Sequence, residues 1–207
     1  MHISEGILSG PVLISGATLA AAGTAVGLKK LDYDRIAQSG ILAASFFVAA
    51  LIHIPIGPSS VHLILNGIVG LLLGWAAFPI ILVALLLQAV LFQFGGITTL
   101  GVNTVIMALP AVIGHYLFRR FIFMSSRIAA VAAFGCGFLA IFGGAMLLGL
   151  TLVFTEEKFF NVAALAIGAH VPVMIIEGIL TAFCVLFLRK VYPQLLPGAR
   201  KKIDIKK

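Results

Sequence analysis

Long apolar runs dominate the chain, and short segments rich in glycine, proline or charge separate them. No Asp, Glu, Lys or Arg occurs between Ile36 and Phe118, so this block has to be divided at helix-breaking segments. Three such segments are clear, at residues 53–60, 76–79 and 95–101. The pattern therefore predicts seven apolar spans, at roughly residues 6–28, 36–54, 61–77, 79–94, 101–118, 128–154 and 162–188.

Most of these runs approach the length of about 20 residues that an α-helix needs to cross hydrocarbon, and lipid permits only helices or closed barrels. A membrane barrel would need short segments of alternating polarity instead of unbroken runs. We therefore expect an all-α integral membrane protein, with residues 1–207 forming a single transmembrane domain built as a seven-helix bundle. The third and fourth spans are short and Pro79 lies between them, so a re-entrant pair is the alternative there.

The composition supports a membrane protein. Of the 207 residues, 61% are hydrophobic and only 10% are charged, whereas soluble domains average about 45–50% apolar and about 25% charged residues. This excludes a water-soluble domain and a disordered chain. The two cysteines, Cys136 and Cys184, lie inside apolar runs, which excludes a disulfide scaffold.

The basic residues predict the orientation of the bundle. With the N-terminus outside and the C-terminus inside, 13 of the 14 Lys and Arg residues lie on the inner side, and only Lys158 lies outside. The net charge of +7 therefore reflects membrane topology and does not indicate nucleic acid binding. No basic residue precedes the first apolar run, so we expect no cleaved signal peptide, and Met1 should be retained because His2 is too large for the usual trimming.

Histidines gather at the predicted outer side. His2, His53 and His62 lie at the outer ends of spans and His170 lies in the outer third of the last one, whereas His115 lies near the inner end and is expected to be interfacial. A single histidine in a bundle usually makes a structural hydrogen bond, but several that converge can bind Zn, Cu, Ni or Co. The pattern indicates a metal site near the outer face.

His2 is a special case because it is the second residue. The α-amino group of Met1, the backbone nitrogen of His2 and its imidazole Nδ1 can close two fused chelate rings on one metal, once the backbone nitrogen loses its proton. Three nearly coplanar nitrogens favour Ni(II) or Cu(II), and an imidazole from His62 or His53 can complete a square. The alternative is that Met1 and His2 form a frayed terminus.

Glu177 is the one acid inside a predicted span, two helical turns after His170. An intramembrane carboxylate is costly and is a functional hypothesis by default. It can serve either as a structural hydrogen-bond partner or as a proton relay. Gln93 and Asn103 flank the Gly95–Gly101 loop and can orient ligands there.

Two kinds of activity lack their signatures. The chain has no Gly-Lys pair, so it has no P-loop site for ATP. Ser59 and Ser60 lie close to His62, but the G-x-S-x-G elbow of serine hydrolases and the H-E-x-x-H motif of metalloproteases are both missing. An intramembrane metal-dependent hydrolase is therefore only a minor alternative.

Four blocks of the sequence contain most of the candidate residues: M-H-I-S-E-G at residues 1–6, G-P-S-S-V-H at 57–62, F-Q-F-G-G-I-T-T-L-G-V-N at 92–103 and A-H-V-P-V-M-I-I-E-G at 169–178. These blocks resemble the CbiM/NikM family, whose members are substrate-specificity components of energy-coupling-factor transporters for nickel and cobalt. The resemblance implies a six-helix energy-coupling-factor S-component fold with one extra N-terminal helix.

The resemblance also implies a ligand set. The metal would be held by the Met1 amine, by the backbone nitrogen and imidazole of His2, and by His62. The remaining candidates would lie around the metal or along its entry path: His53, Ser60, Gln93, Asn103, His170 and Glu177.

Partners follow from the resemblance too. It implies a prokaryotic plasma membrane, a transmembrane coupling protein, cytoplasmic ATPase subunits that hydrolyse ATP, and a separate small membrane subunit, with this chain itself not an enzyme. The loop at residues 55–62 is nearer to the nickel branch than to the P-G-G-T-S-S-H-like loop of cobalt members, which favours Ni(2+) over Co(2+) as cargo. The alternative function is a secondary carrier for a small organic substrate, in which Glu177 and His170 relay protons.

Overall fold

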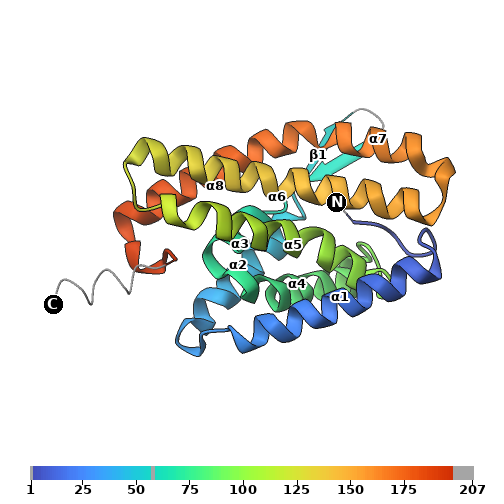
Figure 1. The fold of residues 1–207 in the computed structure, drawn as a ribbon, viewed down its shortest axis with the longest axis horizontal. Helices are drawn as coiled ribbons and strands as arrows, with labels where there is room; N and C mark the ends of the chain where they lie inside the picture. Colours follow the sequence, from blue (N-terminus) through green and yellow to red (C-terminus); the bar gives the residue numbers. More distant parts are fainter. Residues whose placement is uncertain (1, 57–58, 198–207) are drawn as a thin grey trace.

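The computed structural model describes residues 2–56 and 59–197, and most of them are helical (Figure 1). The helices are α1 (Gly10–Lys29), α2 (Ile36–Ala49), α3 (Asn66–Leu73), α4 (Ala77–Phe92), α5 (Leu100–Phe118), α6 (Ser126–Thr155), α7 (Phe160–Ala169) and α8 (Val171–Val191). Short 3-10 turns occupy Tyr33–Arg35, Gly74–Ala76, Arg119–Phe121, Glu157–Phe159 and Pro193–Leu195. An antiparallel hairpin of β1 (His53–Ile56) and β2 (Ser59–His62) joins α2 to α3.

The helices α5 and α6 cover the residues of the predicted spans 101–118 and 128–154. The first helix begins at Gly10 and not near residue 6, because Gly6 has a left-handed φ of 77° and keeps the preceding segment in a turn. Pro11 lies in the first turn of α1, where its missing N–H costs nothing. The N-terminal residues are thus outside the helix and can reach other elements.

The prediction for residues 36–54 was too long. The second helix ends at Ala49, and the chain enters the hairpin at His53. With 14 residues, α2 is about 21 Å long, which is shorter than the hydrocarbon core of about 30 Å.

The third and fourth spans are divided at a different place from the one predicted. The break lies at Gly74, whose φ of 57° ends α3, whereas Pro79 lies in the first turn of α4, where proline is tolerated. The chain reverses there, because α3 starts just after His62 and the last turns of α4 return to the same histidines through Gln88. The helix α3 is only about 12 Å long at 1.5 Å per residue.

The last predicted span, 162–188, is interrupted. The helices α7 and α8 meet at His170, two residues before Pro172, which has no N–H to continue the helical ladder. The N–H of His170 bonds to the Ile167 carbonyl, and its side-chain Nδ1 lies 2.7 Å from the Ala166 carbonyl oxygen. The His170 imidazole therefore bonds to the Ala166 carbonyl, which at the break does not accept the hydrogen bond from the His170 N–H.

Five described segments are long and apolar enough to cross a membrane, so the protein is a multi-pass membrane protein. The seven-span count is not confirmed, because α2 and α3 are short, and the N-outside orientation stays a prediction. The longest helix, α6, packs against α5 and α8, and α1 lies along the opposite edge of the bundle (Figure 1). Large apolar side chains such as Val131 and Phe183 are more than two-thirds exposed, as expected of a lipid-facing surface.

Candidate metal centre

The two histidines of the predicted ligand set lie in direct contact. Nδ1 of His2 is 2.9 Å from Nε2 of His62, and the two ring centroids are 4.7 Å apart. They are 60 residues apart in the sequence and come from the N-terminal segment and the end of β2. Folding therefore brings the imidazoles of His2 and His62, which were predicted to act together, into contact.

Gln88, on the last turns of α4, fixes the protonation of His2. The Gln88 side-chain nitrogen donates to the Phe47 carbonyl. The Gln88 side-chain oxygen therefore faces His2 and lies 2.8 Å from Nε2 of its imidazole. Because that oxygen can only accept, the proton of the neutral imidazole lies on Nε2 and the lone pair lies on Nδ1. This lone pair is the one that a metal would need, and it faces His62.

Asn103 and Thr99 hold the N-terminal segment at its third residue. The Asn103 side chain accepts from the Ile3 N–H at 3.0 Å and donates to the Ile3 carbonyl at 3.1 Å. The Thr99 hydroxyl donates to the same carbonyl at 2.9 Å. Both backbone groups of Ile3 are thus bound, and the residue before it cannot slide along the site.

The loop that carries these groups needs its two glycines. Gly95 has a φ of 75°, and a Cβ there would lie 2.9 Å from the Asn103 amide nitrogen and 3.5 Å from the His2 ring. At Gly96 a Cβ would overlap the side chain of Glu5, whose carboxylate accepts from the Thr98 N–H at 3.1 Å. The N-terminal segment therefore packs directly on the Gly95–Thr99 backbone.

The other candidates have varied positions. His53 pairs with His62 across the open end of the hairpin, and Ser60 pairs with Pro55, although the side chains of His53 and Ser60, like the whole of Met1, lie outside the described residues. Gln93 ends α4 in a left-handed conformation with an exposed side chain. Among the described residues, no three His, Cys, Asp or Glu side chains gather to form a metal-binding group.

Two candidates that the sequence offered as proton relays have backbone partners. His170 bonds to the Ala166 carbonyl, and Glu177 accepts from the N–H groups of Ile64 and Leu65. His115 is buried, and its Nδ1 lies 2.7 Å from the Leu71 carbonyl oxygen at the end of α3. Each of the three side chains thus has a backbone partner, while His170 Nε2 and Glu177 Oε2 are buried without a hydrogen-bond partner among the described residues.

Comparisons with known proteins identify the family of the chain. A family model described as "CbiM: Cobalt uptake substrate-specific transmembrane region" matches residues 2–195. The chain belongs to the CbiM family.

Relatives in several organisms extend the comparison. A Haemophilus influenzae protein, provisionally described as a metal transport protein, is 45% identical over 95% of this chain and 97% of its own length. The fused nickel transport protein NikMN of Rhodobacter capsulatus is 34% identical over 97% of this chain and 65% of its own length. The cobalt transport protein CbiM of Geobacter sulfurreducens is 30% identical over 95% of this chain and 61% of its own length.

The fold of this CbiM-family chain is similar to solved structures as well. A crystal structure of a transition metal transporter has a TM-score of 0.75 and 28% identity, and covers 92% of this chain and 93% of its own. A truncated form of a transition metal transporter has a TM-score of 0.74 at the same identity, covering 92% of this chain and 99% of its own. The helical bundle is therefore a fold seen in transition metal transporters.

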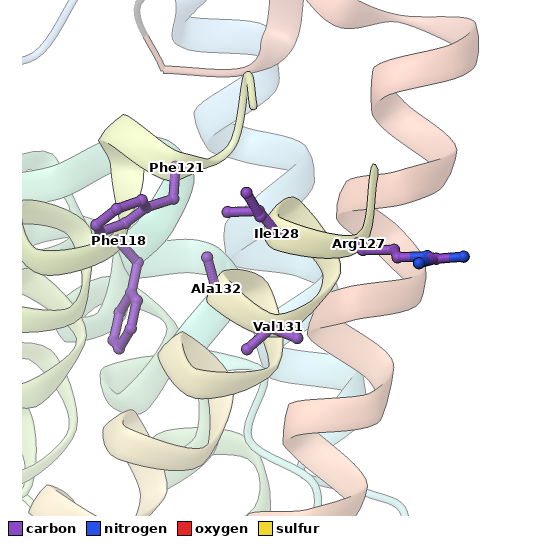
Figure 2. A pocket seen from close by; sticks show the side chains of 6 residues that line it. All are labelled: Phe118, Phe121, Arg127, Ile128, Val131 and Ala132. Atoms are coloured by element: carbon purple, nitrogen blue, oxygen red, sulfur yellow. The ribbon is translucent and has the colours of Figure 1, made fainter. Parts of the chain in front are cut away.

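An apolar hollow lies elsewhere on the surface of this CbiM-family chain. It has a volume of about 390 Å³ and lies between the end of α5 and the start of α6 (Figure 2). Phe118, Phe121 and Val131 line it, and the charged end of Arg127 points away from it (Figure 2). It offers no ligand for a cation and is consistent with a lipid-facing surface.

Gln88 was not among the candidates from the sequence, although it is the one polar side chain inside α4. We expect Gln88→Leu to weaken metal binding by about 10–100-fold, because the His2 ring loses the acceptor that fixes its orientation and its tautomer. Titration calorimetry with Ni(2+) measures the effect. Gln93→Leu, on the exposed glutamine at the end of the same helix, is the matched control and should bind as the wild type does. Equal affinities for the two variants would contradict this role for Gln88.

Proposed function

We propose that the chain is the substrate-binding membrane subunit of an ATP-driven energy-coupling-factor importer for nickel or cobalt ions. The observation that carries this proposal is the contact of the His2 and His62 imidazoles beside the chain start, with Gln88 directing the Nδ1 lone pair of His2 toward His62. Membership of the CbiM family and relatives described as nickel and cobalt transport proteins support the choice of cargo.

The separation of the two imidazoles suits one metal ion. Bonds from a metal to imidazole nitrogen are about 2.0–2.1 Å long, so two neighbouring ligands in a square plane are about 2.8–3.0 Å apart. The 2.9 Å between His2 Nδ1 and His62 Nε2 falls in this range. In the chelate we propose, the Met1 amine and the His2 backbone nitrogen occupy the other two corners.

The proposed ligand set favours nickel. Four nitrogens in a plane suit Ni(2+), which also promotes the loss of the backbone proton more readily than Co(2+) does. The fused nickel transport protein of Rhodobacter capsulatus is one relative that supports this preference. Nickel is therefore the cargo we propose, with cobalt as the second ion.

The energy for import would come from partners. The chain has no P-loop, so we propose that cytoplasmic ATPase subunits hydrolyse ATP and that a transmembrane coupling protein transmits the motion. We propose a separate small membrane subunit as a further partner and a prokaryotic plasma membrane as the location. Capture would occur outside, in the predicted N-outside orientation.

Titration of the purified chain with Ni(2+) and Co(2+) tests this proposal. We expect one metal per chain, tighter binding of nickel, and the absorption of a diamagnetic square-planar Ni(II) centre. Binding should weaken as the pH falls, because the amine and both imidazoles must be deprotonated to act as ligands. Failure to bind either metal would overturn the proposal, and a paramagnetic six-coordinate nickel spectrum would overturn the planar site.

A further inference from the structure

Glu177 makes a contact that links helix α8 to the segment carrying His62. Its Oε1 accepts from the N–H of Ile64 at 2.5 Å and from the N–H of Leu65 at 2.8 Å. The side chain is completely buried, and its Oε2 has no hydrogen-bond partner among the described residues. One carboxylate oxygen thus accepts both hydrogen bonds from a chain segment 112 residues away.

The amides of Ile64 and Leu65 lie at the turn that leads from β2 into α3. Leu65 has a left-handed φ of 59° and is the N-cap of α3, and a leucine adopts this conformation only when its surroundings hold it there. Amides before the first turn of a helix have no helical acceptor of their own. Because Ile64 follows His62 by two residues, the bond to Glu177 fixes how the chain leaves His62.

Close helix packing sets the reach of Glu177. A Cβ at Gly67 on α3 would lie 2.6 Å from the Cα of Gly137 on α6. A Cβ at Gly137 would in turn lie 2.6 Å from the Glu177 carbonyl oxygen. Close packing therefore fixes the distances between α3, α6 and α8. At these distances the glutamate side chain on α8 reaches the start of α3, whereas an aspartate, shorter by one methylene, does not.

We infer that Glu177 is a positioning residue: its carboxylate oxygen holds the His62–Leu65 segment so that the His62 imidazole stays opposite Nδ1 of His2. This inference rests on the proposed metal-binding function. It assigns Glu177 the role of a hydrogen-bond acceptor of fixed length, whereas a proton relay or an electrostatic role would require its charge.

Two substitutions separate length from charge. Glu177→Asp keeps the charge but shortens the side chain, so the bonds to Ile64 and Leu65 are lost and nickel affinity should fall by about 10–100-fold, as for other residues that orient a ligand. Glu177→Gln keeps the length and the accepting oxygen, so nickel affinity and the square-planar absorption should be retained. If Glu177 acted as a proton relay or through its charge, Glu177→Gln should lose more nickel affinity than Glu177→Asp. Thr181→Val, one turn further along α8 and equally buried, is the control and should bind as the wild type does.

Titration calorimetry on the purified chain, with Ni(2+) alone as the probe, measures these affinities. Glu177→Asp should add no further loss in a His62→Ala background, since Glu177 acts through His62. Hydrogen exchange of the Ile64 and Leu65 amides in the metal-free protein gives a second readout. It should be faster in Glu177→Asp than in Glu177→Gln.

The possible outcomes are distinct. Wild-type nickel affinity in Glu177→Asp, or a loss in Glu177→Gln as large as that in Glu177→Asp, would overturn the inference. If the wild-type chain bound no nickel, the proposed function would fail instead, and the exchange rates of the two amides would still decide whether Glu177 holds this segment. If Glu177→Asp gave no folded protein, faster exchange in Glu177→Gln than in the wild type would overturn the inference, and equal rates would support it.

Discussion

A single residue added before Met1 is expected to abolish metal binding. The addition turns the proposed amine ligand into an amide and moves the histidine from the second position to the third. Since even residues that only orient a ligand contribute about 10–100-fold to metal affinity, we expect a loss of more than 100-fold. The metal content of the purified proteins, measured side by side, gives the result.

The contacts of Ile3 explain why the extended chain cannot compensate. Asn103 and Thr99 bind both backbone groups of Ile3, so the N-terminal segment cannot slip by one residue to restore the original register. The same residue added after Lys207 is the control and should leave binding unchanged. A retained formyl group on Met1 should act like the extension. Full metal content in the extended protein would refute the chelate and direct the search to His53, His62, His170 and Glu177.

The long helices were the predictable part of the fold. The α5 and α6 boundaries follow from breakers and charges in the sequence, because lipid requires each span to satisfy its own backbone. The boundary between α3 and α4 could not be located, since proline at residue 79 is a stronger sequence signal than glycine at residue 74. A proline in the first turn of a helix does not break it, and only the structure shows where that turn begins.

The site was partly predictable for a different reason. The position of His2 in the chain and the resemblance to the CbiM/NikM family predicted a ligand set, but the groups that hold His2 and His62 depend on contacts between distant segments. Gln88 lies in an apolar run without a motif of its own, and its role appears only because α4 ends beside His2. Gln93 was a candidate because it adjoins a glycine-rich loop, yet its exposed side chain lies past the last turn of that helix.

His62→Ala is expected to lower nickel affinity by more than 100-fold while the protein still folds. The substitution removes the imidazole whose Nε2 lies 2.9 Å from Nδ1 of His2, and with it one corner of the proposed plane. Loss of a ligand should exceed the 10–100-fold effect of residues that only orient one. Titration calorimetry on the purified variant measures the affinity. Thermal unfolding of the metal-free protein shows whether the bundle is intact.

His115→Ala is the matched control for that substitution, because it also removes a buried imidazole from the same protein. His115 contacts the Leu71 carbonyl at the end of α3, so its loss should lower the temperature of unfolding without weakening nickel binding. His62→Ala should produce the opposite result, with little change in stability and a large loss of affinity. Unchanged nickel affinity in His62→Ala would remove this residue from the site. Equal losses of affinity in both variants would mean that the loss reflects damage to the bundle and not a missing ligand.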